Sequence, residues 1–161
     1  MLRPLTRTAM LAATLALGLA TAPHAAQAQA LITFDDLDAF EYILDNYGSV
    51  TRDIDSEGDP MFSGTIDGLR YMMHFYGCDG ASECNNATFT AFFDGADYKT
   101  DLRTVNAFNE EHRFGKASVD EDGDLKVNYS FTFLGGLTYD TLDDTVDWWR
   151  VILEQVDEFF G

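Results

Sequence analysis

The chain has 161 residues, of which 28 are acidic and 10 are basic, so its formal net charge is −18. This charge repels phosphate backbones and anionic lipid headgroups, which argues against nucleic-acid binding and electrostatic membrane docking. A basic protein partner is compatible with it. Aromatic residues make up 14% of the chain, too many for a disordered acidic tail, so we expect one folded domain.

The first 30 residues have the composition of a secretory signal peptide. Arg3 and Arg7 precede an apolar run over residues 10–22, and residues 28–30 (Ala-Gln-Ala) form a small-x-small cleavage signal. We expect cleavage there, leaving a periplasmic or secreted domain over residues 31–161. The apolar run is too short to span a bilayer, and no cysteine follows it, so we expect no membrane anchor after cleavage.

The first predicted folded element is a helix over residues 33–47. Thr33 is its expected N-cap, with Asp36 completing a capping box, and Gly48 is its expected C-terminal cap. Four strands follow, at residues 49–55, 61–66, 69–76 and 87–93. One face of the third strand is apolar. Its other face carries Arg70, Met72, His74 and Tyr76, which is more apolar than a solvated face requires.

A second helix is predicted over residues 100–112, a hairpin over residues 116–121 and 125–134, and a long final helix over residues 138–160. The order is helix, four strands, helix, two strands, helix. This order predicts an α+β fold in which an antiparallel β-sheet is packed with three helices.

The only two cysteines, Cys78 and Cys84, lie in the loop between the third and fourth predicted strands. In an exported protein a disulfide is the expected state of such a pair. A redox pair usually has two intervening residues at a helix start, and zinc needs further ligands. The folded part offers only His74 and His112, in distant segments, so we expect a structural disulfide and no metal site.

Two acidic stretches have calcium-like spacing: Asp53, Asp55 and Glu57 in one, and residues 120–124 in the other. Neither fits an EF-hand loop, because the glycine or the final bidentate ligand is out of place. We interpret both as polar turns, with an acidic calcium-responsive envelope protein as the alternative function. No catalytic motif, phosphate loop or cofactor motif occurs, so we expect no enzyme and no cofactor.

Two groups of side chains are candidates for binding. Asn106, Asn109 and Arg113 share one side of the second helix with Leu102, a side that we expect to face inward. They either satisfy backbone groups of a nearby loop, such as the cysteine loop, or form a recognition patch. Trp148, Ile152 and Phe159 flank the apolar stripe of the final helix, where they either widen its core contact or form a dimer or partner surface.

Several segments together resemble the YbjN-domain family. They are Tyr-Met-Met-His-Phe-Tyr-Gly-Cys within residues 68–93, the Thr-Phe-Thr-Ala-Phe-Phe-Asp that follows Cys84, residues 105–109 and 113–117, and the Asp-Glu-Asp-Gly-Asp-Leu hairpin. The resemblance implies a regulator of bacterial sensory transduction, without established catalytic residues. It also implies a fold similar to type III secretion chaperones, often dimeric. We therefore expect a non-enzymatic, exported, chaperone-like module that engages a protein partner, or a second copy, through its sheet face or last helix.

Overall fold

The computed structural model describes residues 30–79 and 83–161. The predicted signal peptide lies outside them, except for its last residue, Ala30. Within the described part of the chain, no helix is long and apolar enough to cross a bilayer. The elements are the 3-10 turn η1 (Phe34–Asp36), α1 (Leu37–Asp45), β1 (Gly48–Ile54), β2 (Pro60–Ile66), β3 (Leu69–Tyr76), β4 (Asn86–Phe93), α2 (Leu102–Glu111), β5 (Lys116–Val119), β6 (Leu125–Thr132) and α3 (Tyr139–Phe160).

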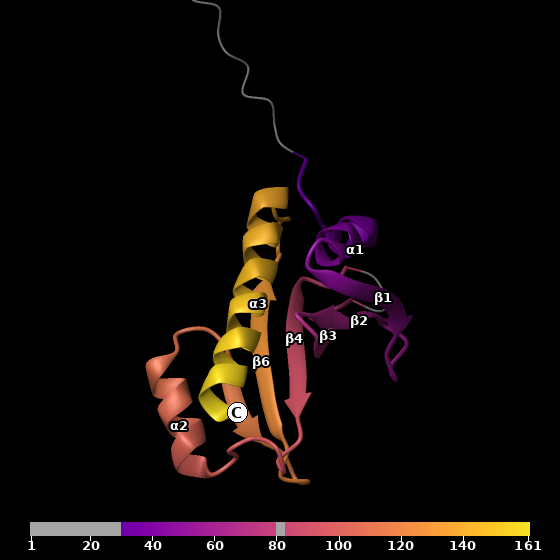
Figure 1. The fold of residues 1–161 in the computed structure, drawn as a ribbon. Coiled ribbons are helices and arrows are strands. Elements are labelled where there is room, and N and C mark those ends of the chain that lie inside the picture. Colours follow the sequence, from indigo (N-terminus) through magenta and orange to yellow (C-terminus); the bar gives the residue numbers. More distant parts are fainter. Residues whose placement is uncertain (1–29, 80–82) are drawn as a thin grey trace, which may run out of the picture.

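The strands form one antiparallel sheet in the order β1-β2-β3-β4-β6-β5. The first four follow one another as hairpins. β6 then pairs with β4, which leaves the short β5 at the edge. Figure 1 shows α3 running along β6 and α1 lying over β1. The predicted α+β class and the order of its elements are confirmed.

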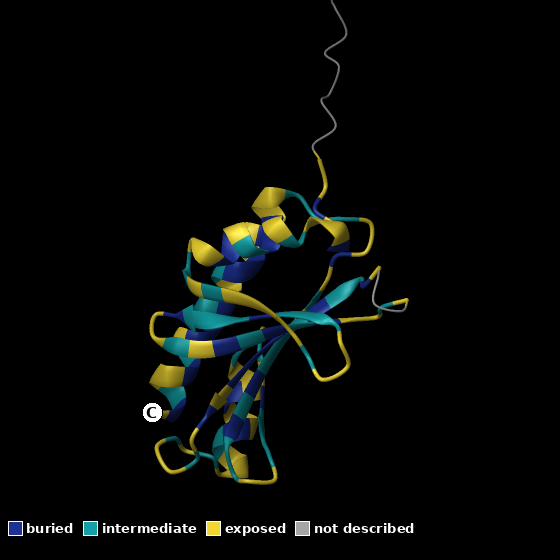
Figure 2. Ribbon diagram, turned by 90° about the vertical axis from the view of Figure 1, so that its right-hand side faces the viewer, coloured by how far each residue is buried: buried dark blue, intermediate teal, exposed yellow. Residues whose placement is uncertain are grey.

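The core lies between the helices and one face of the sheet, which we call the inner face. Burial alternates along β3, where Tyr71, Met73 and Phe75 of the predicted apolar face are buried. Figure 2 shows the buried positions along the sheet. The ring of Trp149 on α3 stacks on Phe89 of β4, with centroids 5.3 Å apart. The opposite, outer face of the sheet is therefore formed by the alternate residues of each strand.

The folded domain begins with Ile32, whose pairing with Leu137 the sequence patterns do not predict. Its N–H donates to the Leu137 carbonyl (2.7 Å), and the Leu137 N–H donates back (2.9 Å). Ile32 is only 2% exposed, so the fold begins two residues after the predicted cleavage site. The capping box is present, because the Thr33 N–H donates to the Asp36 carboxylate at 3.1 Å.

The end of the first helix differs from the prediction. α1 stops at Asp45, and Gly48 is the first residue of β1 instead of a C-terminal cap. The physical reason lies in the neighbouring strand. A Cβ at residue 48 would be 1.9 Å from the carbonyl oxygen of Thr65 on β2, so this position needs glycine for close approach and not for helix termination.

The predicted disulfide is confirmed. Cys78 and Cys84 are bonded, with Cα atoms 3.8 Å apart, where β3 leads into β4. Beside the bond, the Asn85 N–H donates to the Tyr76 carbonyl at 3.2 Å. Cys84 is buried against the core. The bond thus closes the loop at the base of the hairpin.

Candidate functional site

The outer face of the sheet carries two hollows that no helical residue lines. The strand register places its side chains in rows, such as Met61, His74, Thr88 and Ser130, and next to them Ser63, Met72, Thr90 and Asn128. Both hollows are lined by Met72, so they adjoin.

The first hollow, of about 780 Å³, lies at the end of the sheet that carries the β1–β2 turn. Its wall combines Met61, Met72 and the half-exposed Tyr76 with His74 and the carboxylates of the turn. Hydrogen bonds from backbone N–H groups, first that of Asp59, hold the pKa of Asp55 below its usual value, which keeps this end acidic.

The second hollow, of about 480 Å³, lies at the opposite end, where β3 begins. Hydroxyl side chains dominate its lining: Ser49, Thr51, Ser63, Thr65 and Thr90. Arg70, Met72 and Phe92 are also part of the lining. The outer face therefore has an apolar middle around Met72, an acidic end and a basic, hydroxyl-rich end. The sequence signal for it was the apolar excess on the outer face of the third strand.

The prediction that Leu102, Asn106, Asn109 and Arg113 form an inward-facing side of α2 is wrong. Leu102 is 72% exposed, and Asn106 on the same side is also exposed. The inward residues are Val105 and Phe108, because the Phe108 ring packs against two phenylalanines at the end of α3. Arg113, also exposed, lies beyond the helix end.

Asn109 serves the backbone of the edge strand. Its amide group donates to the Ala117 carbonyl (3.0 Å) and accepts from the Ala117 N–H (2.8 Å). The groups it satisfies belong to β5 and not to the cysteine loop. The structure therefore separates Asn106, Asn109 and Arg113 in role, and it does not gather them around a hollow as one patch.

The three candidates on α3 also separate. Ile152 is fully buried, and Phe159 packs edge-on against Phe108. Trp148 is 38% exposed and lies 4.7 Å, between ring centroids, from Phe114. Phe114 also contacts Tyr129 of β6. The exposed Phe114 and Trp148 thus form an aromatic cluster with the partly buried Tyr129. The sequence pattern missed Phe114 and Tyr129, because they meet α3 only in the folded chain.

The two calcium-like stretches fold into the same five-residue turn. In each, an Asp side chain accepts two backbone N–H bonds, at 2.9 and 3.0 Å for Asp55 and at 3.0 Å twice for Asp120. The glycine of each turn, Gly58 or Gly123, has φ near +90° (94° and 91°). Turn chemistry accounts for this spacing. Among the described residues, no three His, Cys, Asp or Glu side chains gather as metal ligands.

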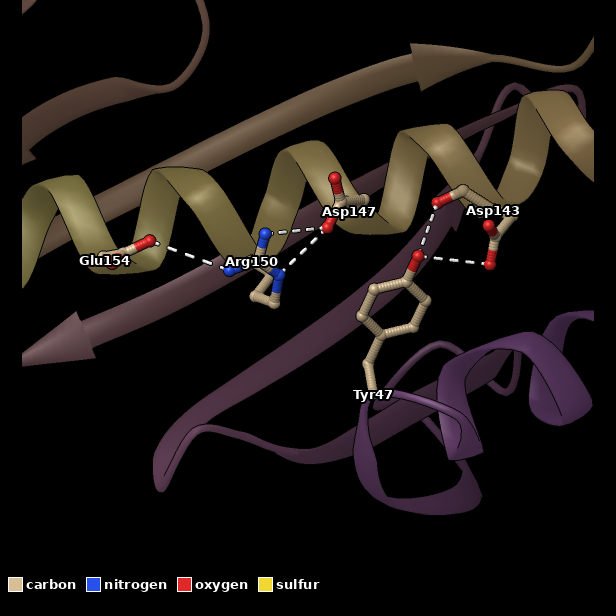
Figure 3. Close-up of polar contacts among 5 residues, drawn as sticks. All are labelled: Tyr47, Asp143, Asp147, Arg150 and Glu154. Atoms are coloured by element: carbon tan, nitrogen blue, oxygen red, sulfur yellow. Dashed lines mark hydrogen bonds and ion pairs between the residues drawn. The ribbon is translucent and has the colours of Figure 1, made fainter.

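A polar contact joins the turn after α1 to α3 on the helix side of the molecule (Figure 3). The Tyr47 hydroxyl lies 3.1 Å from the Asp143 carboxylate and 3.2 Å from its carbonyl oxygen. Farther along α3, Arg150 pairs with Asp147 (2.9 Å) and Glu154 (3.7 Å). Burial and the Asp143 hydrogen bond raise the pKa of Tyr47 to about 12. The Tyr47 contact ties the segment after α1 to α3, whereas the Arg150 ion pairs lie within α3. None of the five side chains lines either outer-face hollow.

Comparison with protein families matches residues 36–161 to YbjN, described as "Putative bacterial sensory transduction regulator". The chain belongs to the YbjN family. The match covers α1 through α3 and every strand of the sheet. YbjN carries a regulator description and is not a known enzyme family. No curated protein matches the chain.

Proposed function

We propose that this YbjN chain is an exported, non-enzymatic, chaperone-like module that binds a segment of a protein partner on the outer face of its sheet. The single observation that carries the proposal is this hollowed face, which no helix covers. Binding of a partner protein is one way in which a regulator of sensory transduction acts. The family description supports a regulatory role, and the hollowed face supports the proposal that contact occurs there.

The side chains of the outer face are more typical of a protein-binding surface than of a solvated one. An antiparallel sheet can leave one face solvated, but such a face is then polar. Here Met61, Met72, Tyr76 and Phe92 interrupt the hydroxyl side chains, and Tyr76 and Phe92 are large exposed apolar residues. Aromatic and methionine side chains are enriched where proteins meet, and methionine adapts to varied partners.

The proposed export rests on two features. Residues 1–30 have the composition of a signal peptide. The Cys78–Cys84 bond is of the kind that persists in oxidising compartments. The partner would then be a protein of the periplasm or the cell surface.

Site-specific photocrosslinking tests the proposal. A benzophenone amino acid replaces Tyr76 on the outer face or, as the matched control, Tyr42 on α1; both tyrosines are exposed (51% and 66%). In cells that export the chain, we expect a discrete protein adduct from position 76, and its loss when Met72→Glu is added. Adducts from position 42 only, or none from position 76, would contradict the proposal.

A further inference from the structure

We propose that the segment bound on the outer face is acidic, and that its carboxylates contact Arg70 and Lys126 on either side of the Phe92 ring. This inference rests on the proposed function and specifies the chemistry of the partner. It runs against the net charge of the chain, which by itself favours a basic partner.

The strand register brings these three residues into one row. Phe92 of β4 pairs with Lys126 of β6. On the other side, β3 and β4 pair Met72 with Thr90, and Arg70 and Phe92 each lie two residues beyond that pair. Both line the hydroxyl-rich hollow, so the two basic residues approach the ring from the strands on either side of β4.

The ring between the cations is available to a ligand. Phe92 is 46% exposed and lines the hydroxyl-rich hollow together with Arg70. The Lys126 ammonium lies 5.4 Å from the centroid of the ring, a cation–π distance. A ligand that carries both carboxylates and apolar groups would use the whole row, whereas a simple inorganic anion would leave the ring uncovered.

The two cations have no carboxylate partner among the described residues. The ion pairs of the described chain use Arg52 and Arg150. Asp53 of β1 pairs with Met61 beside His74, which is about 13 Å along β3 from Arg70 and so is largely screened at physiological ionic strength. Asp94 and Asp124 are nearer, because they lie two residues, about 7 Å, from Phe92 and Lys126. No carboxylate lines the hydroxyl-rich hollow itself, whose charged lining residue is Arg70.

The acidic helices are separated from the row by the sheet. α1 carries Asp38 and Glu41, and α3 carries Asp143, Asp147 and Glu154, and both helices pack on the inner face. One packed layer is about 10 Å thick, again more than a Debye length. A ligand carboxylate in the hydroxyl-rich hollow therefore meets the Arg70 guanidinium and no lining carboxylate. A carboxylate can accept two parallel hydrogen bonds from the Arg70 guanidinium.

Selection from a random 12-residue peptide library tests the inference. The library is panned on the mature, disulfide-bonded protein. The enriched peptides are titrated by fluorescence anisotropy against the wild type and the single variants Arg70→Glu, Lys126→Glu, Met72→Glu and Arg103→Glu. Arg103 is exposed on α2, so its variant changes the net charge equally but leaves the row intact. Circular dichroism confirms the fold of each variant.

We expect enrichment of Asp and Glu, at least tenfold weaker binding to Arg70→Glu, and unchanged binding to Arg103→Glu. Lys126→Glu should weaken binding likewise. Neutral or basic peptides that still depend on Met72 would overturn the acidic partner and leave the proposed function standing. Peptides indifferent to Arg70, Lys126 and Met72 alike would overturn both.

Discussion

Asn109 of α2 binds both backbone groups of Ala117 through a single side-chain amide, at 3.0 and 2.8 Å. The amide occupies the place that a neighbouring strand would take, so part of the outer edge of β5 is closed by a helix. Unpaired strand edges invite association with other chains, and covering them is a common protection.

Asn109→Ala should therefore destabilise the domain and open this edge. Two hydrogen bonds are lost, which we expect to lower the free energy of unfolding by about 1–2 kcal/mol. Urea denaturation measures the change. Asn106→Ala on the exposed side of the same helix is the control and should have almost no effect. Equal effects of the two substitutions would show that the amide contact contributes nothing.

The N-terminal anchor makes a second prediction. Ile32→Ala should lower the free energy of unfolding by about 2–4 kcal/mol, because a buried side chain is removed beside the pairing with Leu137. Leu31→Ala, at an exposed neighbouring position, should cost much less. If both variants unfold at the wild-type urea concentration, the segment is not part of the folded unit.

Reduction of the disulfide is expected to destabilise the domain without changing its fold. The Cys78–Cys84 bond closes a small loop, for which chain entropy gives about 2 kcal/mol. Thermal melting of Cys78→Ser/Cys84→Ser beside the wild type measures the loss.

Mass spectrometry of protein from the periplasm should also find an N-terminus at Leu31 and no thiol that alkylates before reduction. A retained signal segment and alkylated cysteines would argue for the cytoplasm.

Alkaline pH should loosen the attachment of α3. The pKa of Tyr47 and that of Tyr98 are raised to about 12, mainly by burial and then by hydrogen bonds to Asp143 and Asp157. A raised folded-state pKa means that the stability these phenols contribute is complete below pH 10, their unfolded value, and is lost as pH rises through about 12. Urea midpoints between pH 8 and 12 should fall, and Tyr47→Phe/Tyr98→Phe should flatten that fall. An equally steep fall in the double variant would assign it to other groups.

The fold could largely be predicted from local patterns, because alternation along β3 and helical spacing along α3 each report burial directly. The wrong predictions concern residues whose environment is set by a neighbour distant in the sequence. Gly48 follows α1 in the sequence, but glycine is needed there because the carbonyl of Thr65 on the adjacent strand, β2, lies too close for a Cβ. On α2 we expected the side with Leu102 to face inward. The side with Phe108 is buried instead, because its ring packs against the phenylalanines at the end of α3.

The candidate site was predictable only in part for the same reason. The apolar excess around Met72 is visible along β3 alone. The Arg70–Phe92–Lys126 row requires β6 to lie beside β4, an order that no local pattern contains. Ile152 and Phe159 were indistinguishable from Trp148 by helical spacing, since the loop carrying Phe114 decides which side of α3 stays exposed.

Methionine methyl NMR tests binding on the outer face most directly. The folded domain has three methionines: Met61 and Met72 on the outer face, and Met73, fully buried on the inner face. The protein is labelled with ¹³C at these methyl groups and titrated with the segment captured at position 76. The account predicts shifts of the Met61 and Met72 signals and an unchanged Met73 signal. A shift of Met73 alone, or no shift at saturating segment, would contradict it.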